Sequence, residues 1–156
     1  LLTVIIPRHI NRTENIINDL DKLKLNVVTH STNQQLSKKT DIYLVDTFGE
    51  TKNFYNLSNI AFLGGSIVNH GGQNPLEAAR LGNYIINGPN IGNFTEIYEY
   101  LKINKISYTA SKVLKMRDIV LSKINKKLPL SKRKKIFDDG NKILDNNIHI
   151  IEKYIQ

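Results

Sequence analysis

The sequence predicts an α/β domain built on a doubly wound parallel sheet. Short apolar runs rich in β-forming residues alternate with amphipathic stretches, which is the pattern of consecutive βαβ units. Turn residues stop several of these runs, as Gly64-Gly65 stops the run at residues 60–63. With 156 residues, of which 40% are hydrophobic and 23% charged, the chain has the size and composition of one globular domain. We therefore expect a single domain over residues 1–156, ending in a helical, basic tail over residues 111–156.

The first strands are predicted from apolar runs and the first helix from helical periodicity. Residues 2–6 form a buried strand that Pro7 ends. Residues 13–24 form a helix, because four apolar side chains recur at helical spacing on one face: Ile16, Ile17, Leu20 and Leu23. Residues 26–29 and 41–45 are further strands, and the second is the richer in β-forming residues.

The middle of the chain contains two more strands, each preceded by a short helix. The helix at residues 52–57 leads into the strand at 60–63. The helix at 75–81 leads into the strand at 84–86, which ends in the turn Asn87-Gly88-Pro89-Asn90.

The last third is predicted to be mainly helical. A helix at residues 94–102 precedes a last strand at 106–109. Two helices at 111–128 and 131–154 follow, with Pro129 in their junction. The second of them carries an apolar stripe that we expect to be buried, against this domain or against a further one: Leu144, Ile148, Ile151 and Ile155.

The positive charge is confined to the last third. The formal net charge is +8, yet residues 1–100 carry 8 Lys and Arg against 9 Asp and Glu, whereas residues 101–156 carry 14 against 5. The excess is concentrated from Lys123 to Lys135. Three interpretations stay open: a solvated helical face, attraction to an anionic membrane surface or acidic substrate, and nucleic-acid binding. Nucleic acid is the least favoured, because aromatic side chains are not interleaved with the basic ones.

Composition excludes several classes of protein. No apolar run is long enough to span a membrane, and residues 1–6 lack the features of a signal peptide. The absence of Cys excludes disulfides and Cys-based zinc sites. The four His are scattered without ligand spacing, so neither a metal nor another cofactor is expected. Because the chain opens directly on a strand at Leu1, we expect it to be a piece of a longer protein.

The candidate ligand-binding residues follow the predicted strands. Doubly wound sheets bind ligands at the carboxyl ends of their strands. Pro7-Arg8-His9 follows the first strand, and Asp46-Thr47-Phe48-Gly49-Glu50 follows the third. Gly64-Gly65-Ser66 follows the fourth, and Gly88-Pro89 follows the fifth. This edge of the sheet is therefore the predicted binding site.

The glycine-rich segment at residues 64–77 is the most informative of these. Its four glycines allow the backbone to adopt positive φ and to approach a ligand closely. Asn74-Pro75 then starts a helix, with Asn74 as N-cap and Pro75 as first residue, and such a helix start can hold a phosphate. Neither a G-x-G-x-x-G nor a G-x-x-x-x-G-K-[ST] motif occurs, which argues against the usual dinucleotide and P-loop sites.

Glu77, three residues after Asn74, has two interpretations. It can fold back on the Asn74 N–H in a capping box, or its carboxylate can accept hydrogen bonds from two ribose hydroxyls. Asn93 and Glu96 repeat the spacing at the next helix, and there we expect a capping box.

Arg8, His9 and His70 are the other candidates. Arg8 can hold a phosphate or carboxylate in a bidentate fork. The alternative for Arg8 is an ion pair with Asp41, Asp46 or Glu50. His70 lies inside the glycine-rich loop, where it either contacts a ligand or is merely exposed.

Taken together, these motifs resemble those of the Kdo transferases, which transfer 3-deoxy-D-manno-octulosonic acid (Kdo) from CMP-Kdo to a lipid A precursor. Three blocks, matching in order and spacing, carry the resemblance: Pro7-Arg8-His9, Val45-Asp46-Thr47-Phe48-Gly49-Glu50, and the segment from Ala61 through Gly64-Gly65-Ser66 to Asn74-Pro75-Leu76-Glu77. Two positions depart from the family pattern: Ile10-Asn11 stands where Pro-Glu is usual, and Gln73 where His is common.

The resemblance implies the Rossmann-like carboxyl-terminal lobe of a GT-B glycosyltransferase, which binds CMP-Kdo without a metal. Arg8 would lie near the phosphate and Glu77 on the ribose. The remaining residues implied to line the donor site are Pro7, Phe48, Gly49, Glu50, Asn74, Pro75 and Leu76, with His9, Ser66 and His70 as further candidates. The general base belongs to the amino-terminal lobe, so no catalytic residue is expected in this chain.

The family also implies the setting of the reaction. The lipid A precursor would be held by the other lobe, at the cytoplasmic face of the bacterial inner membrane, and the basic run could contact that anionic surface. Two rivals remain open: a GT-B transferase or epimerase that uses a UDP-sugar, and a non-catalytic basic module that binds nucleic acid.

Overall fold

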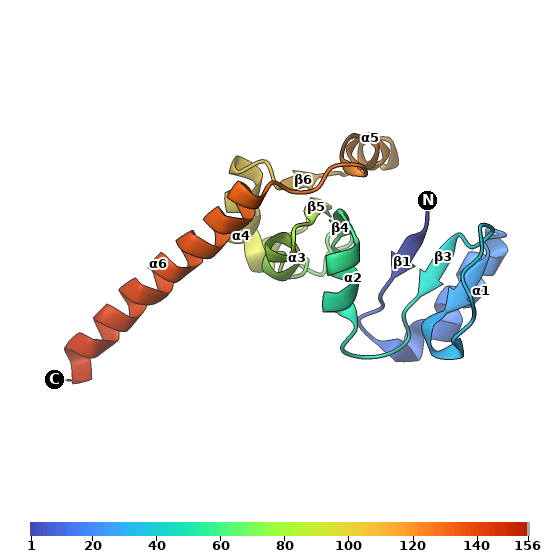
Figure 1. Ribbon diagram of the computed structural model, residues 1–156, viewed down its shortest axis with the longest axis horizontal. Helices are drawn as coiled ribbons and strands as arrows, with labels where there is room; N and C mark the ends of the chain where they lie inside the picture. Colours follow the sequence, from blue (N-terminus) through green and yellow to red (C-terminus); the bar gives the residue numbers. More distant parts are fainter. Residues whose placement is uncertain (156) are drawn as a thin grey trace. The chain divides into compact units, whose positions relative to one another are not determined.

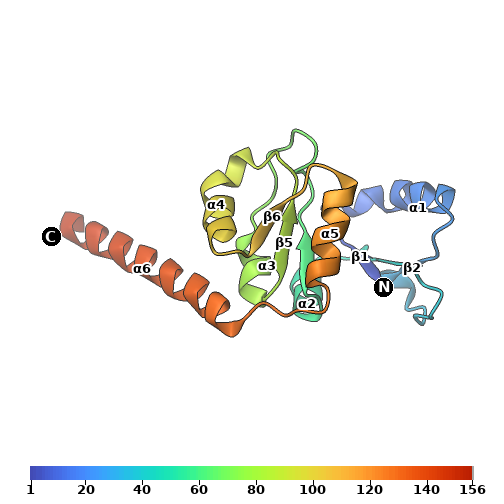
Figure 2. The same cartoon turned by 90° about the horizontal axis from the view of Figure 1, so that it is seen from above.

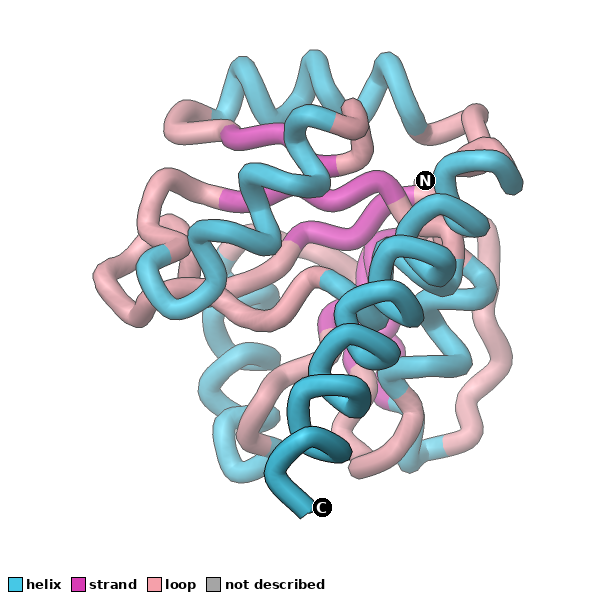
Figure 3. Tube along the Cα trace, turned by 90° about the vertical axis from the view of Figure 1, so that its left-hand side faces the viewer, coloured by secondary structure: helices cyan, strands magenta, loops and turns pink. Residues whose placement is uncertain are grey.

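The computed structural model describes residues 1–155. The chain forms two compact units, of which the first is Leu1–Phe54 and the second begins at Tyr55. Each unit contains a three-stranded parallel sheet. The predicted α/β class with parallel strands is confirmed, and Figure 3 shows the short strands linked by helices and loops. The expected single sheet is corrected to two sheets of three strands, while the division into domains stays a prediction.

The first unit is a parallel sheet of β1 (Thr3–Ile5), β3 (Ile42–Leu44) and β2 (Val27–Thr29), in that order. Helix α1 (Thr13–Lys22) connects β1 to β2 (Figure 2). Two short 3₁₀ helices, η1 (Ile10–Arg12) and η2 (His30–Thr32), lie in the loops after β1 and β2. The central strand has the most buried side chains, since Ile42 and Leu44 are both buried.

The second unit is a parallel sheet of β4 (Ile60–Phe62), β5 (Tyr84–Asn87) and β6 (Ser107–Thr109), with β5 in the centre. Helices α3 (Leu76–Leu81) and α4 (Thr95–Ile103) lie on one side of these strands and α5 (Val113–Lys123) lies on the other (Figures 1 and 2). The remaining elements are α2 (Thr51–Leu57), which crosses the boundary between the units, η3 (Gly92–Phe94) and α6 (Leu130–Ile155). Helices thus cover both faces of the sheet, as a doubly wound fold requires.

The hydrophobic core of the second unit explains why these elements pack together. The side chains of Ile85 on β5, Leu101 on α4 and Ile106 before β6 are fully buried. Ile136 from the first half of α6 joins the same cluster and is only 2% exposed. Burial of such side chains stabilises a fold by about 1.5–3 kcal/mol each.

The second half of α6 decides one of the two alternatives for its apolar stripe. The stripe is not buried against this domain, since the exposed fraction is 57% at Leu144, 44% at Ile148 and 56% at Ile151. Periodicity placed these residues on one face correctly, but no element within residues 1–155 covers that face. No helix in the same described region is both long enough and apolar enough to cross a membrane.

The two halves of α6 provide a matched test of this packing. We expect Ile136→Ala to lower the free energy of unfolding by about 2–4 kcal/mol, because it leaves a cavity in the core. Ile143→Ala on the same helix, where the side chain is 63% exposed, should change it by less than about 0.5 kcal/mol. Urea unfolding followed by circular dichroism measures both. Equal losses in the two variants would contradict the assignment of the core.

The basic run from Lys123 to Lys135 is largely used in structural contacts. Lys132 Nζ donates to the carbonyl oxygens of Asn104 and Lys105, just after α4, at 2.7 and 3.0 Å. Arg133 Nε donates to the carbonyl oxygen of Arg80, in the last turn of α3, at 3.1 Å. Cations at these positions satisfy the free carbonyl groups of a helix end.

Two more cations of the run are also held in place. Lys123 Nζ lies 4.7 and 4.8 Å from the ring centroids of Tyr84 and Tyr108, and Lys135 Nζ lies 2.7 Å from a carboxylate oxygen of Asp139. Burial, and then the charges of Lys123 and Lys105, lower the pKa of Lys132. The helix predicted at residues 111–128 ends at Lys123, so Lys126 and Lys127 lie in the connection to α6 and do not belong to a solvated helical face. They and Lys134 on α6 have exposed side chains.

Candidate functional site

The glycine-rich loop after β4 is bonded to the loop after β5. The Ser66 hydroxyl donates to the carbonyl oxygen of Leu63 at 2.6 Å and accepts from the N–H of Gly88 at 2.8 Å. The Asn90 N–H donates to the carbonyl oxygen of Ser66 at 2.8 Å. Ser66 is fully buried, so its hydroxyl serves to join the two loops, and its predicted ligand contact stays a prediction.

The two loops also touch at Gly71 and Asn93. Gly71 has a φ of +76°, and a Cβ built there would lie 2.5 Å from Asn93 Nδ2. The Asn93 N–H donates to the carbonyl oxygen of Gly71 at 3.3 Å. Glycine is therefore required at this position both for its backbone conformation and for the close approach of the neighbouring side chain.

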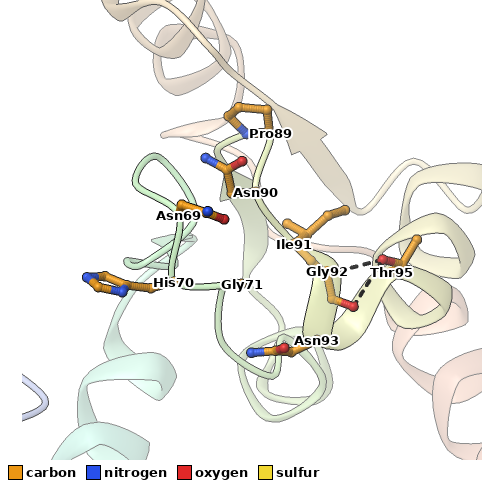
Figure 4. A pocket seen from close by; sticks show the side chains of 9 residues that line it. All are labelled: Asn69, His70, Gly71, Pro89, Asn90, Ile91, Gly92, Asn93 and Thr95. Atoms are coloured by element: carbon orange, nitrogen blue, oxygen red, sulfur yellow. Dashed lines mark hydrogen bonds between the residues drawn. The ribbon is translucent and has the colours of Figure 1, made fainter.

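A pocket of about 630 Å³ lies between these loops (Figure 4). Figure 4 shows the Asn69 amide pointing toward Asn90, whereas the His70 ring points away from the second loop. The lining residues are Asn69, His70, Gly71, Pro89, Asn90, Ile91, Gly92, Asn93 and Thr95. Of these residues, the sequence indicated His70, the glycine-rich loop with Gly71, and Pro89 after the fifth strand as parts of the binding edge. The remaining polar residues were missed because asparagine is common throughout the chain and carries no motif of its own.

The start of α3 differs slightly from the prediction. The helix begins at Leu76, with Pro75 at the N-cap position, so it starts one residue later than expected. Asn74 Oδ1 accepts a hydrogen bond from the Leu76 N–H at 3.0 Å, which closes an Asx turn before the helix. With only six residues, α3 has a small dipole, so the negative charge of a phosphate would be stabilised more by Arg8 than by the helix.

Neither of the two capping boxes considered from the sequence is formed. Within the part of the chain that the structure describes, the Glu77 carboxylate makes no hydrogen bond and is exposed. The N-cap position of α4 is Phe94, without a side-chain cap, and Asn93 lines the pocket instead. Glu77 is therefore free to bind a ligand. The pKa of Tyr55 is raised first by the burial of Tyr55 itself and then by the negative charge of Glu77.

Tyr98 on α4 fixes the segment between the pocket and α3. Its hydroxyl donates to the carbonyl oxygen of Gln73 at 2.8 Å, and burial raises its pKa to about 12. The backbone that leads from Gly71 to Asn74 is thereby held against the body of the second unit.

The first unit contributes the loops after β1 and β3. These strands are parallel neighbours, so Pro7-Arg8-His9 and the loop at 46–50 follow the same edge of the sheet. Phe48 in that loop is 73% exposed, and Gly49 adopts a φ of +88°. An exposed aromatic side chain and an arginine that follow the same edge of a sheet are suitable for contacts to a nucleotide base and its phosphate.

The ion pair considered for Arg8 is not formed among the described residues. Each of the three acidic candidates bonds to a different partner: Asp41 to Asn26, Asp46 to Ser31, and Glu50 to Asn53. Burial acts to raise the pKa of Asp46, but its two hydrogen bonds from Ser31 prevail and hold that pKa below the usual range. The guanidinium of Arg8 is thus left exposed and available for an anion.

The candidate residues fall into two groups. Pro7, Arg8, His9 and Phe48-Gly49-Glu50 belong to the first unit, and Asn74-Pro75-Leu76-Glu77 belongs to the second, together with Ser66 and His70. Convergence of the two groups on one ligand stays a prediction. Among residues 1–155, no group of three His, Asp or Glu side chains is placed to hold a metal ion.

The chain resembles known proteins along nearly its whole length. A 3-deoxy-D-manno-octulosonic acid transferase of Rickettsia conorii is 32% identical over 158 aligned residues, covering 97% of this chain and 34% of the relative. That of Haemophilus influenzae is 40% identical over 101 residues, covering 65% of this chain and 24% of the relative. The chain thus spans about a third or less of the length of these relatives. No protein-family model matches it.

A solved structure shows the same fold. It is the crystal structure of the C-terminal CMP-Kdo binding domain of WaaA from Acinetobacter baumannii, with a TM-score of 0.76 and 28% identity, covering 92% of this chain and 74% of that one. The fold is therefore that of one lobe of a GT-B glycosyltransferase. The chain belongs to the Kdo transferase family, where it corresponds to the carboxyl-terminal domain.

Proposed function

We propose that this chain is the donor-binding domain of a Kdo transferase and binds CMP-Kdo. The observation that carries the proposal is the match to the CMP-Kdo binding domain of WaaA over 92% of the chain. The exposed and unpaired state of Arg8 and Glu77 supports it, because both side chains are free for a ligand.

The proposed roles follow from the chemistry of CMP. Arg8 neutralises the phosphate, and Glu77 accepts hydrogen bonds from the two ribose hydroxyls. Phe48, Gly49 and Glu50 line the nucleotide, next to Pro7. Asn74, Pro75 and Leu76 contribute contacts from the second unit, and His9, Ser66 and His70 are further candidate contacts.

The reaction proposed for the whole enzyme is a metal-independent, inverting transfer. An acceptor hydroxyl of a lipid A precursor attacks the anomeric carbon of Kdo, while the bond from that carbon to the phosphate oxygen of CMP breaks. A general base from outside this chain takes the hydroxyl proton, and Arg8 stabilises the charge on the departing CMP. The isolated chain therefore binds the donor but transfers nothing.

Calorimetry with CMP and UDP tests the proposal against the rival UDP-sugar enzyme. We expect the chain to bind CMP at least tenfold more tightly than UDP, and to show no turnover of CMP-Kdo with a lipid A precursor. A preference for UDP would support the rival and overturn the proposal. Turnover by the isolated chain would contradict the proposal that the general base lies outside this chain.

We further propose that the exposed lysines 126, 127 and 134 hold the enzyme at an anionic membrane surface, on the cytoplasmic face of the bacterial inner membrane. Each lysine near such a surface contributes about 1 kcal/mol at low salt. The triple change Lys126→Gln, Lys127→Gln and Lys134→Gln should weaken binding to vesicles containing phosphatidylglycerol at least tenfold.

The matched control removes the same charge from exposed lysines of the first unit, Lys24, Lys38 and Lys39. We expect it to leave vesicle binding within about twofold of the unaltered chain, in a flotation assay at low salt. If both triple variants weaken binding equally, net charge alone is responsible and the membrane-facing role of the run is wrong.

A further inference from the structure

We propose that the pocket between the loops after β4 and β5 holds the acidic sugar of the nucleotide donor, while the CMP part lies beyond it at the start of α3. This inference rests on the proposed function and assigns the sugar to asparagines for which the sequence suggested no ligand contact. The residues that carry it are Asn69, Asn90 and Asn93.

The chemistry of the pocket lining fits a polyhydroxylated acid. The amides of Asn69 and Asn93 each offer two donors and an acceptor, and Thr95 adds a hydroxyl, so several sugar hydroxyls can be bonded at once. Asn90 Nδ2 donates to the carbonyl oxygen of Ile67 at 2.9 Å, which leaves its second N–H and its oxygen for a ligand. None of the nine described lining residues is Asp or Glu, so a sugar carboxylate meets no like charge. Apart from the outward-pointing His70, none of the described lining residues has an aromatic ring on which a base could stack.

The size and rigidity of the pocket also suit a sugar. Its volume of about 630 Å³ lies within the range of small-molecule sites, about 300–1,000 Å³. Its two walls are bonded to each other through Ser66, Asn90 and Gly71. A preformed pocket loses little conformational entropy when it binds a ligand.

Asn93 is the residue best placed for this role. Its side chain makes no hydrogen bond within residues 1–155 and does not cap α4, although the spacing to Glu96 suggested that it would. It lies against Gly71, a glycine with positive φ that leaves room for it. Its amide is thus placed at the pocket wall without a structural hydrogen bond to satisfy.

The position of the pocket matches the connectivity of a nucleotide sugar. Gly71 lines the pocket. Asn74 and Glu77, which are proposed to contact the nucleotide, follow three and six positions later in the chain. The hydrogen bond from Tyr98 to Gln73 holds the backbone between them and the pocket. A donor whose sugar and nucleotide are joined through one phosphate must have adjacent subsites of this kind.

The test is a comparison of CMP with CMP-Kdo in calorimetric titrations of the chain. Asn93→Asp keeps the shape of the side chain but places a carboxylate beside the acidic sugar. We expect it to weaken CMP-Kdo binding at least tenfold and to leave CMP binding within about twofold. The control Asn125→Asp adds the same charge at an exposed position outside the pocket and should change neither affinity.

Each outcome has a distinct meaning. If the unaltered chain binds neither CMP nor CMP-Kdo, the proposed function itself fails. If it binds CMP-Kdo, but Asn93→Asp weakens both ligands equally or neither, the sugar does not occupy this pocket and only the present inference is overturned. If circular dichroism shows that Asn93→Asp is unfolded, the same two titrations are made with Asn69→Ala, which changes an exposed residue on the other wall of the pocket. Weaker binding of CMP-Kdo alone would then support the inference, and an equal effect on both ligands or on neither would overturn it.

Discussion

Replacing Glu77 by Ala is expected to lower the affinity of the chain for CMP by roughly 10- to 100-fold. A hydrogen bond to a charged group contributes about 1.5–3 kcal/mol, and each 1.4 kcal/mol is about tenfold in affinity, so the loss of even one of the two ribose hydrogen bonds accounts for this change. Because Glu77 makes no hydrogen bond in the described part of the protein, its loss should not affect folding. Calorimetric titration with CMP measures the change.

Glu96 provides the matched control for this prediction. Both residues are the second of their helix, and both are exposed. If the role of Glu77 were only favourable charge at a helix start, the two alanine variants would behave alike. We expect Glu96→Ala to bind CMP within about twofold of the unaltered chain. A Glu77→Ala variant that retains full affinity for CMP would show that Glu77 does not bind the ribose.

Replacing Gly88 by Ala is expected to destabilise the second unit by at least about 2 kcal/mol. A Cβ at this position would meet the carbonyl group of Ser66 and the backbone N of Ile67, all closer than 3.0 Å. These are backbone atoms of the joined loops, so they cannot move aside as a flexible side chain would. Because the same displacement deforms the pocket, CMP-Kdo binding should be lost as well.

Gly64→Ala is the control, since a Cβ at Gly64 meets nothing within 4 Å and Gly64 lacks positive φ. We expect its free energy of unfolding to stay within about 0.5 kcal/mol of the unaltered chain. Denaturant unfolding of the two variants measures the difference. If both glycines tolerate Ala equally, the two loops are not in close contact, and the pocket described here is wrong.

The elements of the fold were predictable from local patterns, but their pairing was not. The helix expected at residues 13–24 is found at Thr13–Lys22, and the strand expected at 84–86 at Tyr84–Asn87. Such elements are specified by periodicity and by turn residues within the segment itself. Which strands are hydrogen-bonded depends on contacts between distant residues, and for this reason the division into two sheets could not be predicted.

Of the two alternatives for the apolar stripe of the last helix, burial against this domain is not found, and burial against a further domain stays a prediction. An apolar stripe shows which face of a helix is to be covered, but not what covers it. Ile136 and Ile143 lie one heptad apart on α6, and only the first is buried by the described chain. The relatives extend well beyond the region that this chain spans, and a separate part of such a protein is where a cover for the second half would be found.

The candidate site was predictable where residues form motifs and unpredictable where they do not. The Arg8 and Glu77 assignments came from blocks of residues with a fixed order. The pocket was missed because it depends on the Asn90 and Asn93 loop approaching the Gly71 loop, a contact that appears only in three dimensions. Asn93 was assigned to helix capping because local spacing is the only signal that a single asparagine gives.

The most direct test of the central claim, that this chain is a CMP-Kdo-binding domain, is a crystal structure of the chain with CMP bound. The account predicts that the Arg8 guanidinium contacts the phosphate, that the Glu77 carboxylate bonds to the ribose hydroxyls, and that the Asn93 pocket stays open beside the phosphate. A CMP molecule bound elsewhere, or Arg8 and Glu77 on separate faces of the protein, would contradict it.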